Sequence, residues 1–69
     1  METMALAING ESRTIPAISN LAELIRHLEI SQERIAVELN GNIIRRNDWP
    51  KTPVCEGDRV EIVQFVGGG

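Results

Sequence analysis

Only one segment of the chain repeats its apolar residues with the period of a helix. Leu21, Leu24, Ile25 and Leu28 stand at positions i, i+3, i+4 and i+7, which places them along one side of a helix. A helix of this length is not stable alone, so its apolar side has to pack against another element. The fold must therefore build a second layer from the segments on either side of residues 19–30.

Polar residues mark the start and the solvent side of this helix. Ser19 or Asn20 can cap its N-terminus, and Glu23 stands three residues after Asn20, as a capping box requires. Glu23, Arg26 and Glu29 lie off the apolar stripe, so we expect them to face water.

The segment before the helix alternates with a period of two. Residues 4–9 alternate large apolar side chains with small or polar ones, which predicts a strand. Asn9-Gly10 follows, a residue pair that accepts the positive φ angles of a tight hairpin turn. A second strand is expected over residues 11–16, where Pro16 ends it. The chain thus opens with a β-hairpin, and Met1–Thr3 lie outside the pattern as a ragged start.

The segments after the helix alternate as well. Residues 35–39 predict a third strand, and a second Asn-Gly pair at Asn40-Gly41 turns the chain into residues 42–46. A loop rich in turn-forming residues is expected over residues 47–58, and a last strand over residues 59–66. One helix and about five short strands favour a single mixed sheet packed on the helix. The predicted fold class is α+β with the β-grasp arrangement.

Length, charge and cysteine content limit the functions open to the chain. Its 69 residues suffice for one small domain, expected over residues 1–66 and followed by a flexible glycine tail at residues 67–69. The net charge of −3 argues against nucleic-acid binding, which needs a basic face. Neither a signal peptide nor a membrane-spanning stretch is evident, and the single cysteine, Cys55, cannot form an internal disulfide. We therefore expect a cytoplasmic protein that is monomeric when free.

Residues that could carry catalysis are sparse, and no enzymatic activity or bound cofactor is predicted. No Gly–Lys–Ser/Thr pattern follows a strand, so a phosphate-binding loop is not expected. With only His27 and Cys55 as candidates, neither a metal site nor a nucleophile–base pair is expected. Trp49 could anchor a partner, but we favour its ring folding down to close one end of the core. Arg45 and Arg46 could hold a phosphate, but a solvated pair is the better interpretation.

The predicted last strand carries apolar side chains on both of its faces. If Val60 and Ile62 face the helix, Val63 and Phe65 lie on the outer face of the sheet. Two large apolar groups on an outer face suggest a docking patch for a partner. Alternatively a neighbouring loop covers them, and the pattern alone leaves both interpretations open.

Three glycines directly follow this strand. Fully extended, Gly67, Gly68 and Gly69 reach about 10 Å beyond it, and without Cβ atoms Gly67 and Gly68 can thread a narrow channel. The tail then presents one reactive group, the α-carboxylate of Gly69. This carboxylate becomes a good acyl donor once it is converted to a mixed anhydride with AMP, for which an ATP-using partner is needed. A glycine run can also be a spacer or a remnant of cloning, but the adjacent apolar strand favours the first interpretation.

A further set of short motifs runs through residues 37–69. These motifs are Leu39-Asn40-Gly41, Arg46, Trp49, Gly57-Asp58, Val60-Glu61-Ile62 and the final Gly68-Gly69. As a set they resemble the ThiS family of sulfur carrier proteins in thiamine biosynthesis, although each motif alone is weak. The first half of the chain agrees with the family mainly in length and layout. Cys55 and the proline-flanked loop are individual to this chain.

The resemblance implies a ubiquitin-like β-grasp protein whose Gly69 carboxylate is adenylated by a ThiF-type, E1-like enzyme with ATP. Sulfur drawn from cysteine through a cysteine desulfurase then replaces AMP. The resulting C-terminal thiocarboxylate donates its sulfur to a ThiG-type thiazole synthase. In this scheme Val63 and Phe65 dock and Gly67 and Gly68 thread. Two alternatives stay open, namely a MoaD-like carrier for molybdopterin synthesis and a β-grasp interaction module with an inert tail.

Overall fold

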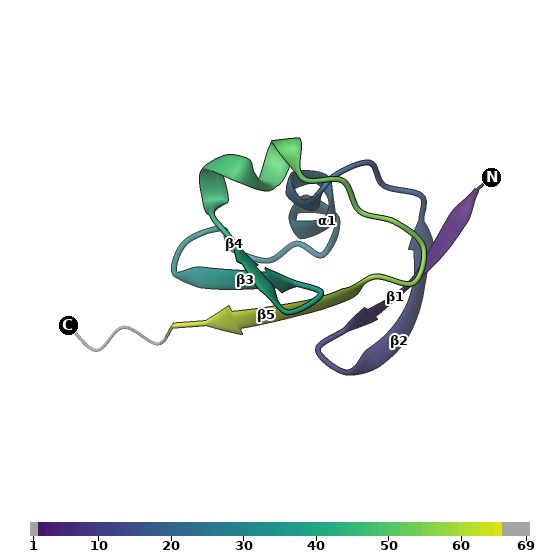
Figure 1. Cartoon of the computed structure of the whole chain (residues 1–69), viewed down its shortest axis with the longest axis horizontal. Coiled ribbons are helices and arrows are strands. Elements are labelled where there is room, and N and C mark those ends of the chain that lie inside the picture. The colour runs from purple at the N-terminus through teal and green to yellow at the C-terminus, as the bar shows by residue number, and fades with distance from the viewer. Residues whose placement is uncertain (1, 66–69) are drawn as a thin grey trace.

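A computed structural model describes residues 2–65 and shows a sheet with one helix packed against one of its faces (Figure 1). The elements in chain order are β1 (Thr3–Ile8), β2 (Glu11–Pro16), α1 (Leu21–His27), β3 (Ile35–Leu39), β4 (Asn42–Ile44), the 3-10 helix η1 (Arg46–Lys51) and β5 (Arg59–Gln64). The predicted last strand extended to Val66, which lies outside the described residues.

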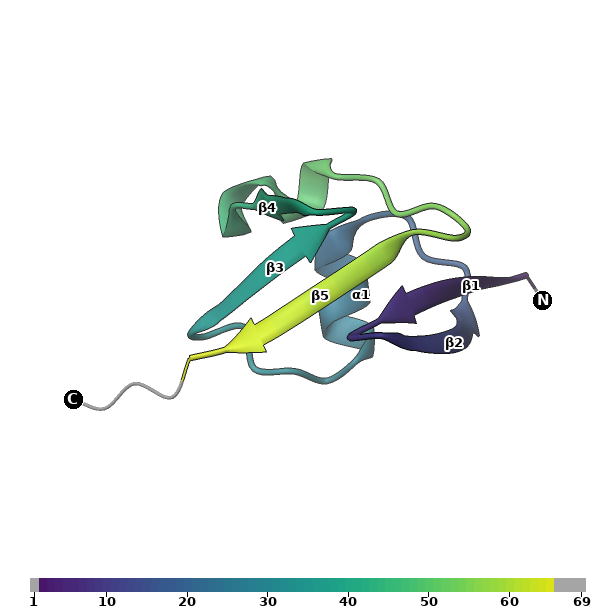
Figure 2. The same ribbon diagram turned by 60° about the horizontal axis from the view of Figure 1, so that its bottom comes forward.

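The strand order β2-β1-β5-β3-β4 puts the last strand of the chain in the middle of the sheet (Figure 2). Strand β5 runs parallel to β1 and antiparallel to β3, whereas both hairpins are antiparallel, so the sheet is mixed. Helix α1 follows the first hairpin and crosses one face of the sheet. This arrangement confirms the predicted α+β fold of the β-grasp type.

Both Asn-Gly pairs form hairpin turns, as predicted. The φ angles are 51° and 83° at Asn9 and Gly10, and 51° and 89° at Asn40 and Gly41. Two successive positive φ angles define the type I′ turn, whose twist matches that of the flanking strands. Asparagine and glycine reach these angles at least cost, and the two pairs therefore fix where each hairpin reverses.

The start of α1 is capped by a reciprocal pair of hydrogen bonds. Asn20 is the N-cap, and its side-chain oxygen accepts a hydrogen bond from the backbone N–H of Glu23 at 2.9 Å. Glu23 returns a bond through Oε1, which accepts from the backbone N–H of Ser19 at 3.0 Å. The capping box is thus confirmed, with the carboxylate reaching one residue further back than in the standard motif.

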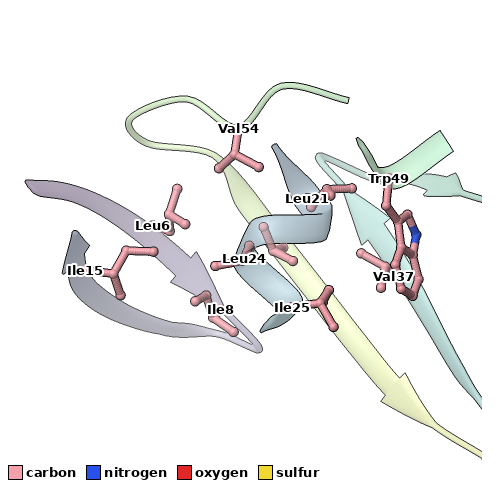
Figure 3. Close-up of a cluster of buried hydrophobic side chains, with 10 residues drawn as sticks. Leu6, Ile8, Ile15, Leu21, Leu24, Ile25, Val37, Trp49 and Val54 are labelled. Atoms are coloured by element: carbon pink, nitrogen blue, oxygen red, sulfur yellow. The ribbon is translucent and has the colours of Figure 1, made fainter. Parts of the chain in front are cut away.

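The apolar stripe of α1 forms the centre of the core (Figure 3). Leu21, Leu24 and Ile25 are fully buried, together with Val37 of β3 and Val60 of β5. The remaining members of the buried cluster are Leu6, Ile8, Ile15, Trp49 and Val54. No polar or charged residue of the described part of the chain is buried, so the two layers are held together by apolar packing.

The prediction of a loop over residues 47–58 is wrong for the first part of that segment, which forms η1. Trp49 of η1 is buried, with 2% of its surface exposed. Its Nε1 donates a hydrogen bond to the carbonyl oxygen of Ile44 at 3.0 Å, so the polar atom of the ring is paired. The backbone curls because the ring has to reach the core, a tertiary requirement that local turn signals do not report. Trp49 thus closes one end of the core, as favoured, and is not free to anchor a partner.

The prediction that Met1–Thr3 lie outside the pattern is wrong for Glu2 and Thr3. Thr3 belongs to β1 and faces Pro16 in the register, and Ala17 donates its N–H to the carbonyl oxygen of Glu2 at 3.1 Å. Hydrogen-bonded and non-bonded pairs alternate in an antiparallel ladder, so Pro16 occupies a position where no N–H is needed. The ladder therefore continues through the proline to Glu2, the first described residue.

The asparagines of the two turns also hold β5. Asn9 donates its N–H to the carbonyl oxygen of Val60 at 2.9 Å, and its Oδ1 accepts from the N–H of Ile62 at 2.7 Å. On the other side, Oδ1 of Asn40 accepts from the N–H of Arg59 at 2.9 Å. The Nδ2 of Asn40 also donates to Oδ1 of Asp58 at 3.1 Å. The central strand is thus fixed from both neighbouring hairpins by side chains as well as by backbone.

These contacts predict different effects for the same change in the two turns. Asn40→Asp replaces the donor to Asp58 with a second carboxylate at an exposed position, so we expect it to lower the free energy of unfolding by about 1 kcal/mol at neutral pH. Asn9→Asp keeps the oxygen that accepts from Ile62 and should cost much less. Urea unfolding of both variants measures the difference. Equal loss of stability in the two variants would contradict this account of the turns.

Candidate functional site

The outer face of β5 carries two exposed apolar side chains. Val63 and Phe65 are 54% and 55% exposed, whereas Val60 is fully buried and Ile62 is partly buried against the core. The predicted division of the strand between an inner and an outer face is therefore confirmed. The alternative that a loop covers Val63 and Phe65 is wrong for the described part of the chain.

A third exposed apolar side chain lies on the same face. In the register, Val63 faces Ala36, Glu61 faces Glu38, and Glu38 faces Ile43 of β4. Residues that face each other share one side of a sheet, so Ile43, which is 72% exposed, lies on the outer face with Val63. We call Ile43, Val63 and Phe65 the outer patch.

The sequence pattern offers a signal for Ile43 only once the strand register is known. Ile43 and Ile44 are adjacent, so one of them must point away from the core. Ile44 is the one that packs against the core, because it faces the buried Val37 across the hairpin. The two-residue turn at Asn40-Gly41 sets this register, so the sequence already carries a signal for the outward direction of Ile43.

Two carboxylates adjoin the outer patch. Glu38 and Glu61 stand directly opposite each other on β3 and β5. Like charges in this position destabilise a sheet, so the free chain gains nothing from the pair. A partner with basic side chains at the rim of its binding surface would relieve the repulsion.

The outer patch lies beside the segment that leads to the tail. Phe65 donates its N–H to the carbonyl oxygen of Arg34 at 2.6 Å, which continues the pairing of β5 with β3 beyond Gln64. The residues predicted to thread and to react, Gly67, Gly68 and Gly69, lie outside the described residues. From Phe65 to Gly69 an extended backbone spans about 14 Å.

The other candidate residues do not assemble into a site. His27 ends α1 and Cys55 lies in the turn before β5, both are exposed, and no hydrogen bond joins them within residues 2–65. Arg46 is exposed and donates to Oε1 of Gln32 at 3.4 Å. In the described part of the chain, no three His, Cys, Asp or Glu residues come together as a metal site. No described helix has the length and apolar character required to cross a membrane.

The ThiS family model matches residues 6–69. The chain is 27% identical to the sulfur carrier protein ThiS of Escherichia coli, covering 96% of this chain and all of that protein. A crystal structure of the thiamine biosynthesis protein ThiS from Geobacter metallireducens superposes with a TM-score of 0.82 at 39% identity, covering 96% of this chain and 100% of that one.

A second kind of relative is much longer. The chain is 38% identical to a thiazole synthase of Paramagnetospirillum magneticum over 66 residues, which is 96% of this chain. It spans only 20% of that protein's length, about a fifth. A domain of this kind therefore also occurs within a polypeptide named for thiazole synthesis.

Proposed function

The chain belongs to the ThiS family of sulfur carrier proteins in thiamine biosynthesis, and from this premise we propose that Gly69 carries the sulfur as a C-terminal thiocarboxylate. In this proposal the chain is a substrate of other proteins and supplies no catalytic group of its own. Its fold presents the tail, and its partners perform the chemistry. The family match and the thiamine-related relatives favour this pathway over a molybdopterin carrier or an inert module.

The chemistry starts from a group that is unreactive at neutral pH. A nucleophile that attacks the Gly69 carboxylate would have to expel oxide, which is a very poor leaving group. A ThiF-type, E1-like enzyme transfers AMP from ATP to the carboxylate and releases pyrophosphate. A cysteine desulfurase passes the sulfur of cysteine on as a persulfide, whose terminal sulfur displaces AMP and forms an acyl disulfide with Gly69. A thiol then reduces the sulfur–sulfur bond, which leaves the thiocarboxylate on Gly69 and oxidises the two thiol groups to a disulfide. A ThiG-type thiazole synthase takes up that sulfur.

The part of the outer patch that lies at the end of β5 is the observation that carries the proposal. Val63 is exposed on the central strand of the sheet and Phe65 directly after it, a few residues before the tail. A partner that binds them is already aligned with the path of Gly67 and Gly68, which can pass a narrow channel because they lack Cβ atoms. The rigid domain supplies the binding free energy that offsets the cost of ordering the tail.

The proposed setting follows from the same scheme. The carrier binds no cofactor, and ATP is held by the activating enzyme. We propose that it works in the cytoplasm as a monomer between encounters. Its bare tail and exposed patch serve the activating enzyme first and the thiazole synthase second.

The sulfur carrier proposal predicts a specific change of mass. Incubation with a ThiF-type enzyme, ATP, cysteine, a cysteine desulfurase and a thiol reductant should replace one oxygen of the chain by sulfur, as read by intact-protein mass spectrometry. Omission of ATP should abolish the change, because the carboxylate is then not activated. A chain extended by one alanine after Gly69 is the matched control and should stay unmodified. If the mass does not change in the complete mixture, or if the extended chain is modified, the proposal is contradicted.

Docking through the outer patch predicts a separation of binding from stability. Phe65→Ala should weaken the affinity for the activating enzyme about tenfold or more, because Phe65 stands at the point where the domain meets the tail. The melting temperature should fall by no more than about 4 °C, since the side chain is half exposed. Ile43→Ala, on the same face but two strands away, is the control and should lose less affinity. Unchanged affinity, or a large loss of melting temperature, would refute this role of Phe65.

A further inference from the structure

The pairing of β5 with β1 ends well before β5 does. Only Ala7 with Arg59 and Ile8 with Val60 are in register between the two strands. Strand β1 then turns away at Asn9, while β5 continues past the tip of that hairpin (Figure 2). Beyond Val60, β5 keeps β3 on one side, and within residues 2–65 no strand lies on the other.

The hydrogen bonds identify which backbone groups face this open side. Residues with odd numbers pair with β3, as the bonds of Arg59 to Asn40 and of Phe65 to Arg34 show. The backbone groups of even-numbered residues face β1. The carbonyl oxygen of Val60 accepts from the N–H of Asn9, and the N–H of Ile62 donates to the side chain of Asn9. The next groups in that row are the C=O of Ile62 and the N–H and C=O of Gln64. Within residues 2–65 no hydrogen bond reaches them.

We propose that an extended segment of the activating enzyme pairs with this open edge, which comprises Ile62 C=O, Gln64 N–H and Gln64 C=O. This inference rests on the proposed function and adds the mode of docking to it. Alternating donors and acceptors on an extended backbone are complemented by another extended backbone, as in strand addition. The last hydrogen bond on this side of β5 runs from the N–H of Ile62 to the side-chain oxygen of Asn9, and the unpaired backbone groups begin immediately after it.

The identity of the occupant follows from the size and place of the edge. Three backbone groups bury far less than the roughly 1,200 Å² that a stable interface needs, so a second copy held only here would not remain bound. A partner that also covers Val63 and Phe65 buries apolar surface in addition to the edge, so the edge then adds to a larger contact. The edge lies on the same strand as these side chains and runs toward Gly69. The activating enzyme is the partner that meets the tail in its unmodified, carboxylate form.

A strand added at this edge would control the direction of the tail. Gln64 lies five residues before Gly69, and the partner strand would hold it in an extended conformation from its free side. The outer patch alone fixes the face of the sheet that is bound. The edge would fix the line along which the tail leaves the domain, so that the carboxylate arrives in one geometry.

Hydrogen exchange of the Gln64 amide tests the edge directly. With the full chain isotopically labelled and saturated with the activating enzyme in the absence of ATP, this amide should exchange at least tenfold more slowly than in the free chain. The amides of Val63 and Phe65, already bonded to β3, should be slow in both states. Unchanged exchange of Gln64 in the complex would overturn the proposal. Slowing that grows with concentration of the free chain, or that occurs only with thiazole synthase, would overturn it as well.

A pair of variants at the same position separates the backbone from the side chain. Gln64→Pro removes the free N–H and should weaken the affinity for the activating enzyme tenfold or more, whereas Gln64→Ala should stay within twofold of the parent. Proline is tolerated at a strand position whose N–H is not paired, and Val63 before it is already extended. Equal affinity of both variants would overturn the proposal, and if Gln64→Pro does not fold, the exchange result decides.

These measurements are independent of the sulfur chemistry. Because ATP is omitted, they report binding alone. Sulfur incorporation with no protection of Gln64 would leave the carrier function standing and remove only the edge. Protection of Gln64 with no sulfur incorporation would leave the edge standing and remove the carrier function.

Discussion

Strand β5 is the element on which the rest of the structure depends, because it is hydrogen-bonded to both halves of the sheet. Strand β1 holds its start in parallel, and β3 holds its whole length in antiparallel. The two hairpins contact each other through this strand, and Asn9 and Asn40 add side-chain bonds to it from either side. Without β5 the chain would be two separate hairpins, each of which is at best marginally stable in water.

The same strand has to serve the core and the surface. Val60 is fully buried under α1, whereas Val63 is more than half exposed three residues later. Adjacent residues of a strand point to opposite faces, so the apolar pair at Ile62 and Val63 supplies one side chain to each. In so small a domain, a docking patch opposite the core is compatible with stability because it removes no residue from the packed interior.

Sequence periodicity predicted most of the fold. Both Asn-Gly turns, the capped helix and the inner face of the last strand follow from local rules of period and turn chemistry, and the structure agrees with them. The sequence predicted that the ring of Trp49 is buried, but it did not predict the 3-10 helix η1 around it. That backbone conformation is imposed by the contact of the ring with the core. The pairing of Thr3 with Pro16 was missed because it depends on which pairs of the antiparallel ladder are hydrogen-bonded, and a proline is tolerated only at a non-bonded pair.

The candidate site divides in the same way between local and long-range information. The outward direction of Val63 and Phe65 follows from alternation along one strand. The outward direction of Ile43 follows from the two-residue turn at Asn40-Gly41, which sets Glu38 opposite Ile43. The open edge at Gln64 requires knowledge of where β1 ends relative to β5, and this register joins segments distant in the sequence, so no local pattern could have supplied it.

The central claim is that the number of residues between the docking surface at the end of β5 and the C-terminal carboxylate decides whether the carboxylate reaches the activating site. Deleting Gly69 tests it most directly, because the shortened chain still ends in a glycine carboxylate, at Gly68, and only the reach falls by about 3.5 Å. We predict that affinity for the activating enzyme is unchanged and that adenylation, measured by ATP–pyrophosphate exchange, slows about 100-fold. Adenylation of the shortened chain at the parent rate would contradict the claim.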